Sequence, residues 1–142
     1  MTKTFARRGA LVLTLATGFV IAGCGGGDDS NGGVDSGAAP EDVVEAFYNA
    51  TVDGDVDTVC ALITEETAKQ AAEQEDAESC EESADGALTD EKTKSIAESV
   101  EVGEATVDGD SATVAVSSQE AGGEGEINLV QEDGEWKIDF AS

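Results

Sequence analysis

Carboxylates are the commonest chemically active side chains in this 142-residue sequence, which has 32 Asp and Glu residues and no histidine. Any general base would therefore be a carboxylate, because the side chain that most often carries protons near neutral pH is missing. The single tyrosine, Tyr48, follows Phe47 and could serve as an acid, although such an aromatic pair more often forms a pocket wall or part of a core. We predict no catalytic residue, and the alternative is a small lyase- or isomerase-like enzyme that uses a carboxylate near Tyr48.

One acidic run is spaced like the start of a calcium-binding loop. Asp53, Asp55 and Asp57 match the first, third and fifth positions of an EF-hand, where carboxylates bind the ion. The sixth position is Thr58 instead of glycine, and the twelfth is Thr64 instead of glutamate. We therefore predict a surface turn in which Asp53 or Asp55 caps the following helix, with no metal site and no other cofactor.

The first 23 residues have the pattern of an export signal. Lys3, Arg7 and Arg8 form a basic region, and the apolar stretch after them is shorter than the roughly 20 residues that span a bilayer. The stretch ends in small residues, which suit a signal peptidase. We predict a signal peptide over residues 1–23 that uses the general export route, with the twin-arginine route as the alternative because the two arginines are adjacent.

Cys24 follows Ile21, Ala22 and Gly23, and the four residues together form a lipobox. In such a motif the cysteine thiol receives a diacylglyceryl group, and cleavage before the cysteine makes it the new N-terminus. Two acyl chains hold a protein stably on a bilayer, whereas one chain gives only marginal binding. We therefore predict a lipoprotein anchored through Cys24 to the extracytoplasmic face of the cell membrane, with ordinary secretion as the alternative.

Residues 24–39 are rich in Gly and Asp, and Val34 is their only apolar side chain larger than alanine. Such a segment buries too little apolar surface to order itself, so we predict a flexible tether behind the lipidated cysteine. Pro40, the only proline, closes it. The rest of the chain, residues 40–142, is long enough for one folded domain with one core.

Two further cysteines, Cys60 and Cys80, remain once Cys24 carries lipid. An even pair in an exported chain meets an oxidising environment, which favours a disulfide. The spacing does not match the C-x-x-C motif of an oxidoreductase. A structural disulfide is therefore favoured over a redox site or a metal site. We predict a Cys60–Cys80 disulfide that stabilises the domain by roughly 3 kcal/mol.

The chain is strongly acidic. Its formal charge is −25, and removal of residues 1–23 takes away three of the seven basic residues, which leaves 32 acidic and four basic residues and a charge of −28. This charge excludes nucleic acid as a partner and makes an anionic membrane surface repel the domain, so that the lipid is the only predicted contact with the membrane. Acidity also suits a saline habitat, a hypothesis that the dependence of stability on salt would test.

Apolar spacing predicts helices in the first half of the domain. A helix that begins at Pro40 and ends before the turn at 53–55 would carry one apolar face made of Val43, Val44, Phe47 and Thr51. A second short helix would bury Val56, Val59, Cys60 and Ile63. Thr64 is placed to cap a third helix with a small face of Ala68, Ala71 and Ala72, and Cys80 would begin a further helical turn.

From about Ser95 the pattern changes to the period of two that is typical of strands. Val100 and Val102 share one face, and the alternation resumes at Ala105 after a slip at Gly103, which indicates a β-bulge. Turns at 108–109, 122–123 and 133–134 then separate four antiparallel strands. The order of helices followed by strands predicts an α+β domain, with helices packed on a curved four-stranded antiparallel sheet.

This order of elements, with the strand end Asp133-Gly134-Glu135-Trp136-Lys137-Ile138, resembles small lipoproteins of high-GC Gram-positive bacteria that carry a nuclear-transport-factor-2-like (cystatin-like) domain. The resemblance implies a cone, in which a bent sheet surrounds a helix and leaves an apolar mouth. That superfamily includes enzymes, ligand carriers and interaction domains, and its members can form dimers through the sheet face. The resemblance therefore leaves the function, the ligand or protein partner and a possible homodimer open.

The aromatic residues give the candidate pocket. Trp136 shares the inward face of the last strand with Ile138 and Phe140, and large aromatic side chains commonly line pockets, although a domain with so few aromatic residues more often uses such a tryptophan simply to fill its core. Phe47 and Tyr48 would face them from the first helix. We predict a non-enzymatic module at the cell surface that binds a small ligand or a protein partner.

Overall fold

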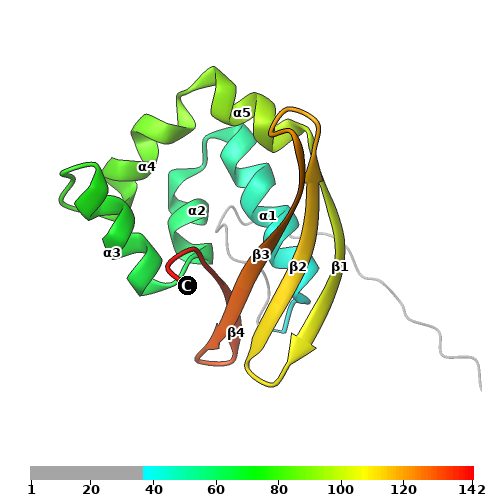
Figure 1. Cartoon of the computed structure of the whole chain (residues 1–142). Coiled ribbons are helices and arrows are strands. Elements are labelled where there is room, and N and C mark those ends of the chain that lie inside the picture. The colour runs from blue at the N-terminus through cyan, green and yellow to red at the C-terminus, as the bar shows by residue number, and fades with distance from the viewer. Residues whose placement is uncertain (1–36) are drawn as a thin grey trace, which may run out of the picture.

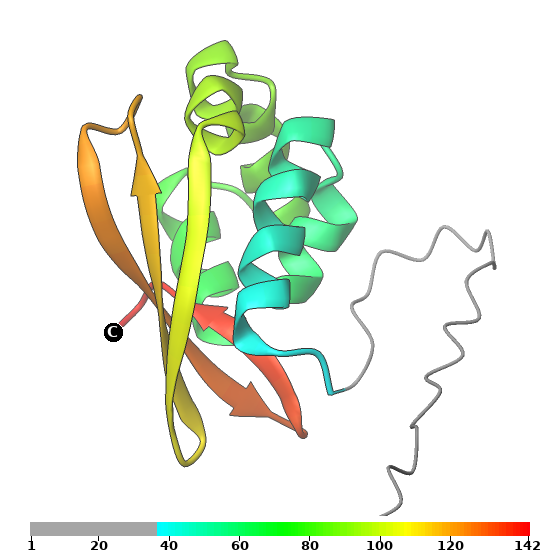
Figure 2. The same cartoon turned by 90° about the vertical axis from the view of Figure 1, so that its right-hand side faces the viewer.

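The computed structural model describes residues 37–142 as five helices followed by four strands (Figure 1). The helices cover one face of a single antiparallel sheet, so the predicted α+β class and the predicted order of elements are confirmed (Figure 2). The predicted signal peptide, Cys24 and most of the predicted tether lie outside the described residues. Among the helices of residues 37–142, none combines the length and the hydropathy that a membrane span needs.

Helix α1 (Pro40–Asp53) begins and ends where the sequence predicts. Proline occupies its first turn, where a missing N–H costs nothing, and the Asp42 carboxylate accepts the N–H of Ala39 at 3.3 Å. Gly54 ends the helix at φ 75°, a left-handed conformation that glycine adopts without strain. The predicted apolar face is buried at Val43 and Val44.

Side-chain caps begin the next two helices, as predicted. Asp55 caps α2 (Val56–Leu62): its carboxylate accepts the Thr58 N–H at 3.1 Å and the Thr58 hydroxyl at 2.7 Å. These hydrogen bonds favour the ionised form and hold the pKa of Asp55 below its usual value. Thr64 caps α3 (Glu65–Gln74), because its hydroxyl oxygen accepts the Thr67 N–H at 3.1 Å.

The last two helices differ from what the sequence predicts. Helix α4 (Cys80–Leu88) is longer than the single turn predicted at Cys80. Helix α5 (Glu91–Glu98) was not predicted, because the strand pattern was expected to begin near Ser95. Asp90 caps α5 by accepting the Lys92 and Thr93 N–H groups at 2.9 and 3.0 Å. The expectation was wrong because Ile96 and Ala97 are the only apolar residues of α5, so the alternating valines that follow dominate the pattern of this segment.

The sheet is a meander in which each strand pairs with the next. Its strands are β1 (Val100–Asp108), β2 (Ser111–Ser118), β3 (Gly123–Glu132) and β4 (Glu135–Asp139). The register of β1 on β2 shifts between Val102 and Ala105, which confirms the bulge. A Cβ at Gly103 would lie 3.1 Å from the Ala115 carbonyl oxygen, so the close approach of the two strands favours glycine there.

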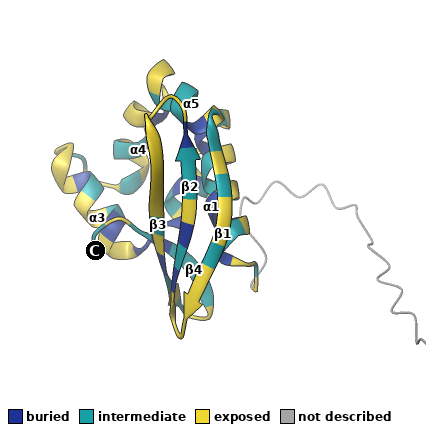
Figure 3. Ribbon diagram, turned by 45° about the vertical axis from the view of Figure 1, so that its right-hand side comes forward, coloured by how far each residue is buried: buried dark blue, intermediate teal, exposed yellow. Residues whose placement is uncertain are grey.

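The core lies between α1 and the sheet. Val43 and Val44 of α1 and Leu62 of α2 pack against the inward face of the sheet, where Val114, Leu129 and Ile138 are fully buried. Buried and exposed positions alternate at the start of β2, from Ser111 to Ala115 (Figure 3). Val107 is 54% exposed near the end of the edge strand β1.

The other edge of the sheet is covered by the α2–α3 connection. The Thr64 N–H donates to the Ile138 carbonyl at 3.0 Å, and Ile63 forms an isolated parallel bridge with Ile138. The Lys137 ammonium donates to the Ala61 carbonyl at the end of α2, at 2.6 Å. These contacts fix the position of β4, and of the residues after it, relative to the helices.

Candidate ligand cavity

An apolar cavity of about 330 Å³ lies among the five helices. Each helix contributes to its wall, as does the segment after β4. Figure 1 shows how the five helices are arranged. No charged side chain of residues 37–142 lines it. The residues that form its wall are Phe47, Tyr48, Thr51, Val59, Ile63, Thr67, Ala71, Cys80, Ser83, Ala84, Ala87, Leu88, Thr93, Ile96, Ala97 and Phe140.

Three aromatic rings form one side of this cavity. Phe47 contacts Tyr48 edge to face, with ring centroids 5.5 Å apart at 79°, and it contacts Phe140 with centroids 5.8 Å apart. Phe140 lines the cavity and is 47% exposed, whereas phenylalanine is more often buried. Phe140 therefore lies where the cavity opens to solvent.

The hydroxyl groups in the wall bond mainly to the protein itself. Thr51 donates to the Phe47 carbonyl at 2.8 Å, and Ser83 donates to the Ala71 carbonyl at 3.2 Å. The Thr67 oxygen accepts the Phe140 N–H at 3.0 Å, which holds the chain end against α3. These internal hydrogen bonds leave mostly carbon atoms to face the cavity.

Tyr48 is the only phenol in the chain and is half-buried. Burial disfavours the charged phenolate and raises the pKa of Tyr48 above its usual value. The residue therefore stays protonated at neutral pH, and its hydroxyl remains a hydrogen-bond donor.

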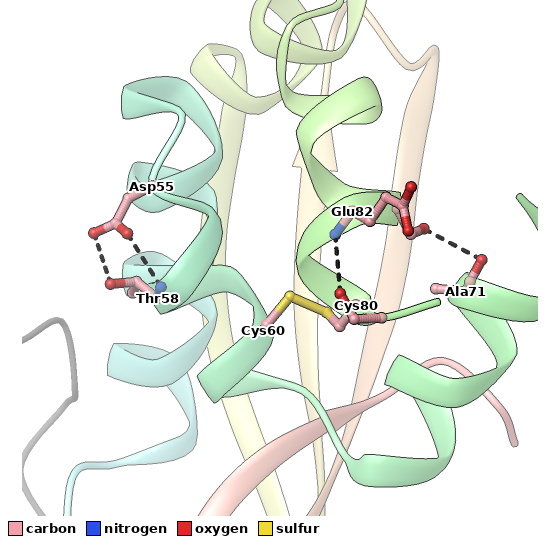
Figure 4. The surroundings of a disulfide bond; sticks show 8 residues. Asp55, Thr58, Cys60, Ala71, Cys80 and Glu82 are labelled. Atoms are coloured by element: carbon pink, nitrogen blue, oxygen red, sulfur yellow. Dashed lines mark hydrogen bonds between the residues drawn. A yellow bond between two sulfur atoms is a disulfide. The ribbon is translucent and has the colours of Figure 1, made fainter. Parts of the chain in front are cut away.

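The predicted disulfide is confirmed, and it forms part of the cavity wall. Cys60 in α2 bonds to Cys80 in the first turn of α4, with Cα atoms 6.0 Å apart (Figure 4). Cys80 itself lines the cavity. The disulfide thus links α2 to α4, and α3 lies between them in the sequence, inside the loop that the disulfide closes.

Of the five residues predicted for the pocket, three meet at the cavity and two do not. Phe47, Tyr48 and Phe140 line it. Ile138 is instead fully buried in the core beneath the helices, and Trp136 packs, half-buried, against the same core. Strand alternation places both on the inward face, as expected, but β4 ends at Asp139 and only Phe140, beyond it, reaches the cavity.

The alanines of α3 and α4 are the wall residues that sequence reasoning missed. Ala71, Ala84 and Ala87 line the cavity where larger side chains would have filled it. A signal was present, because the helical half of the domain contains many alanines and few aromatic residues. Small side chains on several facing helices leave space unless the helices approach closely.

Tyr48 also lines two further spaces. A cavity of about 220 Å³ lies under the β2–β3 hairpin, where Ile96, Val116 and Ser118 contribute to its wall. A third space, of about 430 Å³, lies between α1 and the start of β1 and includes the side chains of Glu45, Asn49 and Glu98. Tyr48 lines all three spaces.

Within residues 37–142, no three Cys, Asp or Glu side chains are grouped in a way that could hold a metal ion. The Asp53–Asp57 run, predicted to form a turn and a cap, is used in that way at Asp55. The apolar cavity is the candidate ligand site of these residues, because its wall is mostly apolar with a few polar groups, as is common for ligand pockets.

Fold and cavity together define the class of protein: an acidic α+β domain with a disulfide-linked helical layer that encloses an apolar cavity. The chain belongs to the family described as domain of unknown function DUF4878, whose model matches residues 34–139. No curated protein and no solved structure matches the chain.

Proposed function

We propose that this protein is a membrane-anchored extracytoplasmic lipoprotein whose folded domain binds a small apolar ligand without catalysing a reaction. The observation that carries the proposal is the apolar cavity among the helices, with a volume of about 330 Å³ and a wall without charged side chains among the described residues. Ligand pockets in proteins commonly measure about 300–1,000 Å³ and have mostly apolar walls with a few polar groups.

The sequence before the domain supports the anchored location. A basic region, a short apolar stretch and a lipobox precede Cys24, and the Gly- and Asp-rich segment after it separates the lipid from the domain. The nuclear-transport-factor-2-like relationship is part of the same proposal. It is supported by helices that pack on one face of a curved antiparallel sheet and by the cavity beside them.

Binding without catalysis is favoured over a lyase or isomerase by the composition of the wall. No carboxylate of the described residues lines the apolar cavity, so a general base is missing from it. The carboxylate of Asp139, next to the wall residue Phe140, accepts hydrogen bonds from the Thr67 hydroxyl and from the Ala141 N–H. Both bonds hold the chain end in place.

Native mass spectrometry of the full chain, released from non-ionic detergent micelles, tests this function. We expect an added mass that is lost on denaturation. Ala87→Phe would place a ring in the wall of the cavity at an exposed position and should abolish the added mass. Ala61→Phe is the matched control, because Ala61 is exposed on α2 and does not line the cavity, and it should leave the added mass unchanged.

Two outcomes would contradict the proposal. A bare protein that also fails to take up any of a panel of apolar compounds would argue against ligand binding and in favour of a protein partner at the membrane surface. An added mass that persists in Ala87→Phe but disappears in Trp136→Ala would place the ligand on the sheet side, away from the cavity.

A further inference from the structure

Tyr48 lines three spaces of different polarity. One is the apolar cavity among the helices. The others are the space under the β2–β3 hairpin, with Ser118 in its wall, and the space that includes Glu45 and Glu98. A molecule in the apolar cavity whose end lies at Tyr48 would therefore have that end next to more polar groups than its tail.

Within residues 37–142, none of the side-chain hydrogen bonds involves the Tyr48 hydroxyl, so its hydrogen-bonding capacity is not used by these residues. Burial raises the pKa of Tyr48. Among the described residues every fully buried side-chain polar atom has a partner, so a phenol oxygen without one borders open space. That oxygen can donate one hydrogen bond and accept others.

We propose that Tyr48 binds the polar end of an amphipathic chain molecule whose apolar tail fills the cavity among the helices and whose polar end carries no charge, such as a long-chain alcohol or ester. This inference rests on the proposed ligand-binding function and specifies the class of ligand. Tyr48 is thus the residue that determines specificity, and the alanine-lined wall accepts the tail.

The absence of charge on the ligand follows from the charges around the phenol. No Lys or Arg of the described residues lines any of the three spaces, so an anionic head group would be desolvated without a counter-ion. Glu45 and Glu98 lie on the polar side of Tyr48 and would repel an anion further. The net charge of the whole chain, −25, acts in the same direction at longer range.

The sizes of the spaces fit an elongated molecule. The apolar cavity alone, at about 330 Å³, lies at the lower end of the range of about 300–1,000 Å³ that is common for ligand pockets. The space under the hairpin is smaller, at about 220 Å³, and shares both Tyr48 and Ile96 with the cavity. A ligand that reaches from one into the other would use a volume well inside the common range.

The single tyrosine allows a site-specific test. In the full chain labelled with ¹³C-tyrosine, one tyrosine spin system reports on Tyr48 alone. We expect decan-1-ol to shift its resonances in a saturable way, while decanoate at the same concentration and at pH 8 shifts them at least tenfold less. The two probes have the same chain length, so the difference isolates the charge of the polar end.

Variants separate the hydrogen bond from the cavity. Tyr48→Phe keeps the ring and removes the hydroxyl, and native mass spectrometry with competing ligands should show decan-1-ol binding weakened about fivefold, the usual effect of one neutral hydrogen bond. Trp136→Phe is the control, because Trp136 lines none of the three spaces, and it should bind decan-1-ol like the wild-type chain.

The outcomes distinguish this inference from the function on which it rests. Equal binding of decan-1-ol and decanoate, or unchanged decan-1-ol binding in Tyr48→Phe, would overturn the role of Tyr48 while leaving a ligand-binding cavity. Binding of neither probe, together with an unshifted tyrosine signal and no retained mass in the wild-type chain, would overturn both.

Discussion

The apolar face of α1 meets two regions that are built differently. On the sheet side, Val43 and Val44 are fully buried against Val114 and Leu129, and the space is filled. One turn further along the same face, Phe47 and Tyr48 line a cavity whose wall also contains many alanines. β-Branched and leucine side chains fill the first region and small side chains leave the second open, so the first region stabilises the fold and the second is the proposed ligand site.

The largest expected effect concerns the filled side. Leu129→Ala should lower the free energy of unfolding by about 3–4 kcal/mol, because a fully buried leucine leaves a cavity in a packed core. Urea denaturation of the full chain measures this. Val107→Ala is the control at an exposed position of the same sheet and should change stability by no more than about 0.5 kcal/mol. Similar losses for the two variants would show that the core is not where the structure places it.

Loss of the disulfide should have the next largest effect. The double variant Cys60→Ala, Cys80→Ala removes a bridge with a sequence separation of 20 residues and should lower the free energy of unfolding by about 3 kcal/mol. Because Cys80 also lines the cavity, decan-1-ol binding should weaken while the sheet keeps its protection from hydrogen exchange. Uniform loss of protection over the sheet and helices would contradict this separation of the two regions.

Enlarging an alanine should distinguish the two regions with a smaller effect. Ala112→Leu adds volume to the filled side, where Ala112 is buried, and should destabilise the domain by about 1–3 kcal/mol. Ala71→Leu adds the same atoms in the cavity and should change the free energy of unfolding by less than about 1 kcal/mol, because it fills open space. Thermal unfolding followed by circular dichroism compares them. Equal destabilisation would mean that the cavity is already filled.

The smallest expected effect is the pH dependence of the α2 cap. The pKa of Asp55 is lowered in the folded state by hydrogen bonds from Thr58, so the folded state favours the carboxylate. The contribution to stability is therefore present above the usual aspartate pKa of 3.8 and is lost as pH falls through the lower folded value. Thr58→Val should bring the Asp55 pKa, measured by carboxyl ¹³C NMR, back toward 3.8. An unchanged pKa would contradict the hydrogen bond from the Thr58 hydroxyl to Asp55.

The fold could be predicted further than the cavity. Caps at Asp55 and Thr64, the bulge at Gly103 and the strand alternation are local signals, and the structure uses each of them. Helix α5 escaped prediction because Ile96 and Ala97 are its only apolar residues, although the sequence does contain its cap residue, Asp90.

The position of the cavity depends on how distant elements pack, and this is not a local property. Alternation placed Trp136 and Ile138 on the inward face correctly, but it could not show that α1 and α2 would cover that face completely. The cavity lies between helices, and Ala71 of α3 and Ala84 of α4 both line it. The distance between these helices depends on the position of α4, which the Cys60–Cys80 disulfide links to α2. Sequence spacing alone carries no information on that distance.

The most direct test of the difference between the filled core and the cavity is where an apolar ligand lies. Intermolecular nuclear Overhauser effects between decan-1-ol and the alanine methyl groups of the ¹³C-alanine-labelled full chain locate it. The account predicts contacts with the methyl groups of Ala71 and Ala87, which line the cavity, and none with that of Ala112 in the core. Contacts with Ala115, on the exposed face of the sheet, without contacts to Ala71 would contradict it.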